Sequence, residues 1–246
     1  MRQHSASSIT SASLGLLACM VFNHAWAQTT TPEEETQSVE VKAVKDPAIM
    51  PYKMAYETIT KVRAASKDKV EMLFRATVKT GMQPVPDLSI YLDGPNTRRK
   101  IDISPTGFIH VPLDTAALAD GADFVTNKKR GSFNVHMQFV PKLGGDTIKY
   151  SEITESIAAA RAALAEIVPW YWRIFIPSVR EIGICYPDKD QVVSMTGTEE
   201  SSRPATKEDK DMLQNKIYCA SFSAKEASLD KDGIITPAPG WSAIFR

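Results

Sequence analysis

Residues 70–78 read VEMLFRATV, and apolar and polar side chains alternate along this stretch. Val70, Met72, Phe74, Ala76 and Val78 would share one face of a strand, while most of the polar side chains take the other. The same alternation recurs in four more stretches, 88–92, 100–103, 108–111 and 133–139. Short strands separated by Gly, Pro and Asn turns predict an antiparallel sheet or sandwich.

Two segments have the spacing of amphipathic helices instead. Residues 52–65 place Met54, Ile59 and Val62 among charged side chains. Residues 151–168 are rich in alanine and have Ser151 as a candidate N-cap. The sequence therefore predicts an α+β protein, mainly antiparallel β-sheet or sandwich modules with one or two amphipathic helices.

The second half of the chain repeats the order of the first. After the helix, we expect strands at 170–176, 179–186 and 217–222, with an exposed excursion over 197–214. Residues 229–237 follow the pattern of 103–112, in which a turn with glycine leads to an apolar strand and then to proline. This order indicates an internal duplication. Two unrelated α+β pieces are the alternative, because short strands match easily by chance.

The N-terminus has the pattern of an export signal. Arg2 precedes the apolar run 14–22, and Ala25 and Ala27 are the small residues that signal peptidase recognises, with cleavage before Gln28. We therefore expect a periplasmic or secreted protein. Lipidation at Cys19 is the less favoured alternative, because the apolar run continues beyond this cysteine.

The predicted organisation has four parts. They are a signal peptide at 1–27, a flexible leader at 28–49, an N-terminal β-rich module at 50–143, and a helix plus a disulfide-containing β-rich module at 151–246.

Cleavage would leave two cysteines, Cys185 and Cys219, in an oxidising compartment. An even number of cysteines there predicts a disulfide bond. A catalytic cysteine with a histidine partner is the alternative.

Composition and motifs argue against several classes of function. The 246 residues include 29 basic and 29 acidic side chains, and this balance is not typical of a nucleic-acid-binding domain. After cleavage the histidines would be His110 and His136, which we expect on solvated strand faces and which belong to no zinc motif. No serine-hydrolase elbow or P-loop occurs either. We expect no cofactor and no membrane-spanning segment in the mature chain.

Two features are candidates for a binding surface. Trp170 and Trp172 belong to the densest aromatic block of the chain, which would serve either as core or as a contact patch. Basic residues form two clusters at expected strand ends, which would either hold an anionic or glycan ligand or simply be solvated turns: Arg98, Arg99 and Lys100 in one, Lys128, Lys129 and Arg130 in the other. A simple meander would place these clusters at opposite ends of the sheet.

These observations favour a non-catalytic binding or accessory protein of the cell envelope. Its partner would be an envelope protein or an anionic or glycan ligand. The alternatives are a cofactor-free, carboxylate-dependent hydrolase acting on an envelope polymer, or a secreted interaction or inhibitor module.

Overall fold

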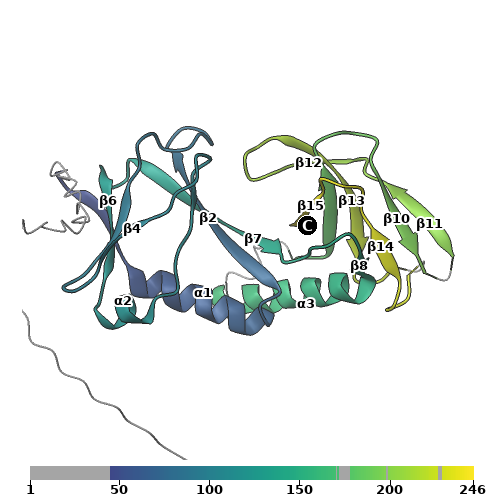
Figure 1. Cartoon of the computed structure of the whole chain (residues 1–246), viewed down its shortest axis with the longest axis horizontal. Helices are drawn as coiled ribbons and strands as arrows, with labels where there is room; N and C mark the ends of the chain where they lie inside the picture. Colours follow the sequence, from purple (N-terminus) through teal and green to yellow (C-terminus); the bar gives the residue numbers. More distant parts are fainter. Residues whose placement is uncertain (1–44, 170, 172–177, 198, 227–228) are drawn as a thin grey trace, which may run out of the picture. The chain divides into compact units, whose positions relative to one another are not determined.

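A computed structural model describes residues 45–169, 171, 178–197, 199–226 and 229–246. These residues form four antiparallel sheets and three helices, so the protein is a mostly-β α+β protein (Figure 1). The predicted signal peptide, with Ala25, Ala27 and Cys19, lies outside the described residues. No helix in the described ranges is long and apolar enough to cross a membrane.

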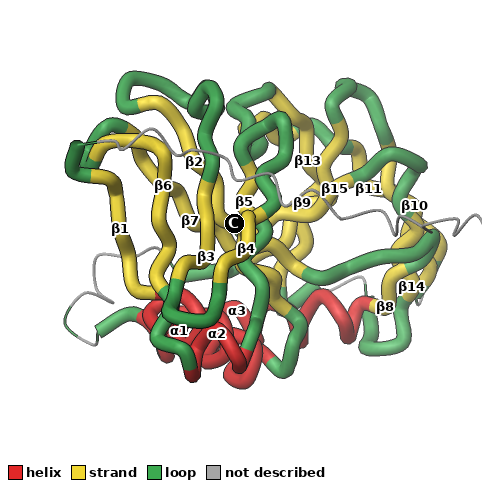
Figure 2. The backbone as a smooth tube through the Cα atoms, turned by 60° about the vertical axis from the view of Figure 1, so that its left-hand side comes forward, coloured by secondary structure: helices red, strands yellow, loops and turns green. Residues whose placement is uncertain are grey.

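The N-terminal half, which spans residues 47–141, contains two sheets and two helices. Its elements are β1 (Pro47–Pro51), α1 (Tyr52–Ser66), β2 (Val70–Val78), β3 (Ile90–Asp93), β4 (Arg98–Ile101), β5 (Phe108–Ile109), α2 (Thr115–Ala119), β6 (Asp123–Lys129) and β7 (Phe133–Pro141). One sheet has the order β1-β6-β3-β4 and the other has the order β5-β2-β7. Figure 2 shows α1 and α2 at one end of the first sheet.

In the C-terminal half, residues 148–246, the described residues also form two sheets, with one long helix. Its elements are β8 (Ile148–Lys149), α3 (Tyr150–Ile167), β9 (Glu181–Tyr186), β10 (Val192–Thr196), β11 (Glu200–Pro204), β12 (Lys207–Lys210), β13 (Lys216–Ser223), β14 (Ile234–Thr236) and β15 (Ser242–Phe245). The sheet orders are β8-β14-β10-β11 and β15-β9-β13-β12.

The two halves have the same strand order. In each, a short edge strand runs directly into a long helix, β1 into α1 and β8 into α3. The order β1-β6-β3-β4 then matches β8-β14-β10-β11, and β7-β2-β5 matches β15-β9-β13, with β12 added at the edge of the second half. Corresponding strands also follow one another in the same order along the chain in both halves.

Each long helix begins with a buried tyrosine that makes the same pair of hydrogen bonds. The Tyr52 hydroxyl donates to the Pro112 carbonyl and accepts from the Asp114 N–H, both at 2.7 Å. The Tyr150 hydroxyl donates to the Ser223 carbonyl at 3.0 Å and accepts from the Glu226 N–H at 2.7 Å. In both halves the partners are at or just after corresponding strands, β5 and β13, so the tyrosine ties the helix to the second sheet.

Helices α1 and α3 pack against each other. Val62 of α1 and Ala160 of α3 belong to one buried cluster, and each lies ten residues after the tyrosine of its own helix. Phe139 of β7 and Phe245 of β15 pack against the same cluster. Corresponding elements of the two halves therefore meet in one core.

The structure confirms the predicted strand at 70–78 and both predicted helices to within a few residues. Two details were wrong. The predicted excursion at 197–214 contains strands β11 and β12, because β10 and β13 supply neighbours with which its polar residues pair. The N-cap of α3 is Lys149 instead of Ser151, since the helix starts at Tyr150, two residues before the start that an N-cap at Ser151 implies. The structure also shows that Arg75 and Thr77, on the polar face of β2, are buried.

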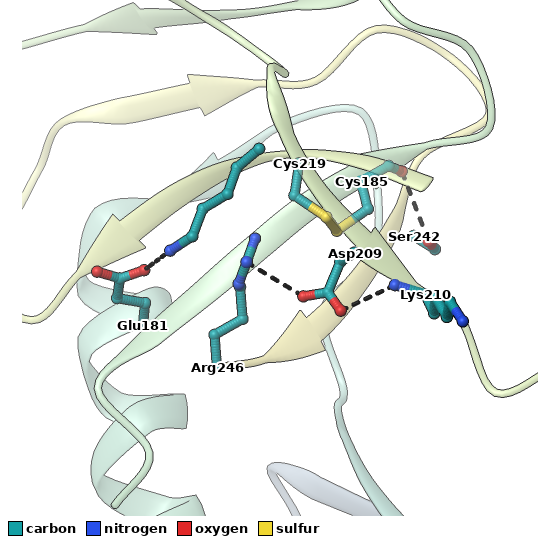
Figure 3. The surroundings of a disulfide bond; sticks show 8 residues. Glu181, Cys185, Asp209, Lys210, Cys219, Ser242 and Arg246 are labelled. Carbon is teal, nitrogen blue, oxygen red and sulfur yellow. Dashed lines mark hydrogen bonds and ion pairs between the residues drawn. A yellow bond between two sulfur atoms is a disulfide. The ribbon is translucent and has the colours of Figure 1, made fainter. Parts of the chain in front are cut away.

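The disulfide bond between Cys185 and Cys219 is confirmed (Figure 3). The two cysteines are direct partners in the β13–β9 ladder, and both are buried. A disulfide bond is compatible with an extracellular or periplasmic location.

Candidate functional site: an apolar cavity in the N-terminal half

The two sheets of the N-terminal half enclose a cavity of about 230 Å³, which we call the apolar cavity. Alternation along β2 and β7 builds one wall: Phe74 and Ala76 face Met137 and Val135 in the antiparallel register, on the same side of the sheet. The first sheet supplies the opposite wall. The complete lining is Ala48, Ile49, Met50, Ala55, Phe74, Ile90, Ile109, Val111, Phe124, Thr126, Gly131, Phe133 and Val135.

The apolar cavity reaches the surface beside β1 and β7. These strands are the outer members of their sheets, at the opposite edges from β4 and β5. At those other edges, Ile103, two residues after β4, forms a bridge with Ile109 of β5. Ile49 on β1 and Val135 on β7 both line the cavity, yet they are 47% and 53% exposed. Large apolar side chains left in water at the rim of a cavity are typical of a ligand entrance.

One polar side chain, Thr126, lines the apolar cavity. Its hydroxyl donates to the Lys128 carbonyl at 3.0 Å and accepts from the Lys128 N–H at 3.3 Å. Both hydrogen-bonding roles of this hydroxyl are therefore used within its own strand. The lining demands no polar partner from an occupant, so an apolar occupant fits it best.

At the matching place in the C-terminal half, the described residues form a buried core. This core is built from fully buried residues of α3 and of the facing sheets, among them Ile153, Ile157, Ile184, Phe222 and Ile235. Counted from the tyrosine that begins each helix, Ile153 of α3 corresponds to Ala55 of α1. The alanine leaves part of the space that isoleucine occupies in the other half.

A second cavity of about 350 Å³ lies between α1 and strands β2 and β5, and it is more polar. Glu71, Asp102 and His110 are among its lining residues. Arg63 and Lys142 also line it, and both pair with Asp68, at 3.7 and 2.7 Å. The hydrogen bond from Lys142 holds the pKa of Asp68 below its usual value.

The two histidines do not meet. His110 follows β5 and His136 lies on β7, and β2 separates these strands. His110 is exposed, whereas His136 is half-buried and its Nε2 lies 2.9 Å from the Thr77 hydroxyl. Within the described ranges, no group of three or more His, Cys, Asp or Glu side chains could hold a metal ion.

The two basic clusters lie at opposite ends of the first sheet, as a meander predicts. In the ladder of this sheet, Asp93 of β3 is the partner of Arg98 of β4 and also of Asp123 at the start of β6. Arg98 and Asp123 therefore lie at the same end of the sheet. Lys129 ends β6, so roughly 20 Å of strand separates the level of Arg98 from Lys129, and roughly 10 Å separates the level of Lys100 from Lys128. Arg99 pairs with Asp114 at 3.2 Å. Arg130 pairs with Asp46 at 3.7 Å.

The predicted aromatic surface lies outside the described residues, because Trp170 and Trp172 do. The apolar cavity was not predicted, although a signal for it exists in the sequence. Tyr52 and Tyr150 begin two helices of similar pattern, and aligning them reveals alanine at one core position where the other helix has isoleucine. Comparison of the chain with protein-family models, curated proteins and solved structures found no match.

Proposed function

We propose that this chain is a non-catalytic binding protein that holds a small apolar molecule in the apolar cavity. One observation carries the proposal: the two halves share a strand order, yet among the described residues Ile153 is packed in a fully buried core whereas its counterpart Ala55 lines a cavity. The apolar cavity also reaches the surface between exposed apolar side chains of β1 and β7. Cleavage after Ala27 and action in the periplasm or outside the cell remain part of the proposal, supported by the disulfide bond.

The energetics of such a site are those of apolar burial. Removing apolar surface from water is worth about 25 cal/mol per Å². An apolar cavity of about 150 Å³ in another protein stays dry and binds benzene. The apolar cavity here is larger, although it is below the roughly 300 Å³ that marks the smaller end of typical ligand pockets. A ligand of a few linked carbon atoms or a single ring suits this volume.

We also propose that the halves arose by duplication of one module. The shared strand order, the paired tyrosines and the contact between α1 and α3 support it. Contact between equivalent elements is what a symmetric dimer produces, so fusion of such a dimer explains the arrangement. A related chain with one half alone should then dimerise through this helix, and a monomeric relative of this kind would count against the idea.

The binding proposal is tested by titrating the purified full chain with octanol, by calorimetry or by ligand-detected NMR. Octanol should bind at one site in the wild type. Ala55→Ile, which places in the first half the residue used by the second, should abolish or strongly weaken this binding. Ile153→Ala is the control, because it opens space in the other half and should leave octanol binding to the apolar cavity unchanged.

Val135→Asp tests the entrance independently, in case Ala55→Ile disturbs the fold. Val135 is half exposed, so a charge is tolerated there but places a hydrated group at the rim. Both variants should retain the wild-type circular dichroism spectrum. Unchanged octanol binding in both variants, or no binding to the wild type, would overturn the proposal.

Carboxylate-dependent hydrolysis remains the alternative, and the second cavity is where it would take place, because Glu71 and Asp102 both line it. Hydrolysis of an envelope polymer that is lost in both Glu71→Gln and Asp102→Asn, but kept in Ala55→Ile, would favour this alternative.

A further inference from the structure

We propose that the ligand of the apolar cavity is an anionic amphiphile, a single apolar tail that ends in a carboxylate, with the carboxylate held at Lys128 and Lys129. This inference rests on the proposed function and adds the chemical class of the ligand. It assigns a role to one of the two basic clusters and none to the other.

The basic cluster Lys128–Arg130 directly adjoins the lining of the apolar cavity. Gly131, the residue after Arg130, lines the cavity. On the neighbouring strand, Ala48 lines it as well, and the residue before it, Pro47, is the ladder partner of Lys129. The Arg130 N–H donates to the Asp46 carbonyl at 3.0 Å, which continues the pairing of these segments. One residue beyond the apolar lining, both strands therefore reach the basic cluster.

The charges at this end of the cavity are predominantly positive. Arg130 is paired with Asp46, and both side chains are more than half exposed. In the described part of the chain, Lys128 and Lys129 have no carboxylate within ion-pairing distance. Lys45 precedes Asp46 and adds a further exposed cation. Lys128 lies on the same face of β6 as Thr126, and the exposed Lys129 follows it at the end of the strand. An anionic group emerging from the cavity here would meet Lys128 first, with Lys129 beside it at the rim, and neither charge is already compensated.

The apolar lining accepts the tail of such a ligand but not its charged end. The Thr126 hydroxyl is occupied within its strand, so the cavity offers nothing to a polar group placed inside it. A ligand with a charge at one end would therefore be oriented, tail inward and carboxylate outward. The other basic cluster, Arg98–Lys100, lies on β4, two strands away from β6, with Arg98 level with Asp123 and Lys100 level with Val125, so it does not adjoin the cavity end at Gly131.

The test compares octanoate, octanol and octylamine, which share a tail and differ in charge. Exposed ion pairs contribute modestly, so the full chain should bind octanoate about threefold to tenfold more tightly than octanol at low salt. Octylamine should bind most weakly. The preference for octanoate should shrink in about 0.5 M salt, because screening weakens exposed charges.

Two matched double variants locate the charge. Lys128→Ala with Lys129→Ala should reduce octanoate affinity to that of octanol and leave octanol binding unchanged. Arg98→Ala with Lys100→Ala removes two positive charges from the other basic cluster. This double variant should change neither the affinity for octanoate nor the affinity for octanol. Equal affinity for octanoate and octanol in the wild type, or the same loss in both double variants, would overturn the inference while the proposed function stands. Absence of octanol and octanoate binding alike would instead overturn both.

Discussion

Ala55 and Ile153 hold the same position in two corresponding helices, three residues after the buried tyrosine with which each helix begins. Ile153 is fully buried in a closed core, whereas Ala55 lines a cavity. The isoleucine side chain has three more carbon atoms than that of alanine. The smaller residue occurs in the half that contains the apolar cavity.

This pair predicts unequal effects on stability when each residue is replaced by the other. Ile153→Ala should lower the free energy of unfolding by about 2–5 kcal/mol, since it removes packed methyl groups and leaves a void. Ala55→Ile should change it by no more than about 1 kcal/mol, because its added atoms enter existing space. Urea denaturation followed by circular dichroism measures both. A loss of several kcal/mol in Ala55→Ile would show that the cavity does not extend far enough over this helix position.

The tyrosine hydroxyls provide a second comparison between the halves. Tyr52→Phe and Tyr150→Phe each remove a hydroxyl that bridges two backbone groups, so each should lower the free energy of unfolding by about 1–3 kcal/mol. Burial raises the pKa of Tyr52 above its usual value, and the hydrogen bond from the Asp114 N–H opposes this rise. Tyr56→Phe is the control and should have little effect on the free energy of unfolding. Tyr56 lies about one helical turn after Tyr52, and the centroids of the two rings are 5.8 Å apart.

Local patterns predicted the elements that depend on neighbours in sequence. The alternation in 70–78 and the alanine-rich run before Ile167 were sufficient for β2 and α3, because strand and helix periods are local properties. The polar strand β12 could not be predicted from a local pattern of apolar residues. Its residues, KEDK, form a strand because β13 offers free hydrogen-bonding groups beside them.

Arg75 illustrates why contacts between distant parts of the chain, such as those that form the apolar cavity, were harder to predict. Its guanidinium is buried and donates to the carbonyls of Thr106, Met82 and Met212, at 2.8, 2.7 and 2.6 Å. Met212 is 137 residues away in sequence, so the pattern around 75 could not reveal this partner. The apolar cavity has the same origin, because its walls come from strands that are distant along the chain.

Removing the disulfide bond should destabilise the chain without changing the strand order. Cys185 and Cys219 are 34 residues apart, and loss of a crosslink over such a loop costs about 2–4 kcal/mol. The double variant Cys185→Ala with Cys219→Ala should therefore unfold at lower urea concentration, as should the reduced wild type. A difference below about 1 kcal/mol would mean that the β13–β9 ladder holds this region without the crosslink.

Gly183 should also be sensitive, for a steric reason in the same region. A Cβ at this position would lie 3.1 Å from Cys185 Sγ, 3.2 Å from Arg246 Cδ and 3.3 Å from Cys219 Cβ. Arg246 also pairs with Asp209 at 3.2 Å, as Figure 3 shows, so it has little freedom to move away. Gly183→Ala should lower the free energy of unfolding by about 1–3 kcal/mol, measured by the same denaturation. Gly144→Ala, where a Cβ meets no atom within 4 Å, is the matched control.

Glu226 predicts how stability depends on pH. Its carboxylate accepts hydrogen bonds from Arg203 at 2.9 Å and from the Ser223 N–H at 2.7 Å, and its side chain is 16% exposed. Burial alone would raise the pKa of Glu226, but these hydrogen bonds outweigh burial and lower the pKa below its usual value. In the unfolded chain the pKa returns to about 4.3. As the pH falls, the unfolded state therefore binds the proton first.

The stabilisation by Glu226 is complete above about pH 5 and is lost as the pH falls through the unfolded-state pKa to the folded-state pKa. Glu226→Gln should lower the free energy of unfolding by about 1–3 kcal/mol at pH 7 and should flatten its decline between about pH 6 and pH 3. Glu155→Gln is the control, since the Lys69–Glu155 pair is on the surface and the change should have a smaller effect. Denaturation curves at several pH values that run parallel for the wild type and Glu226→Gln would show that the Arg203–Glu226 contact does not set the acid stability of this half.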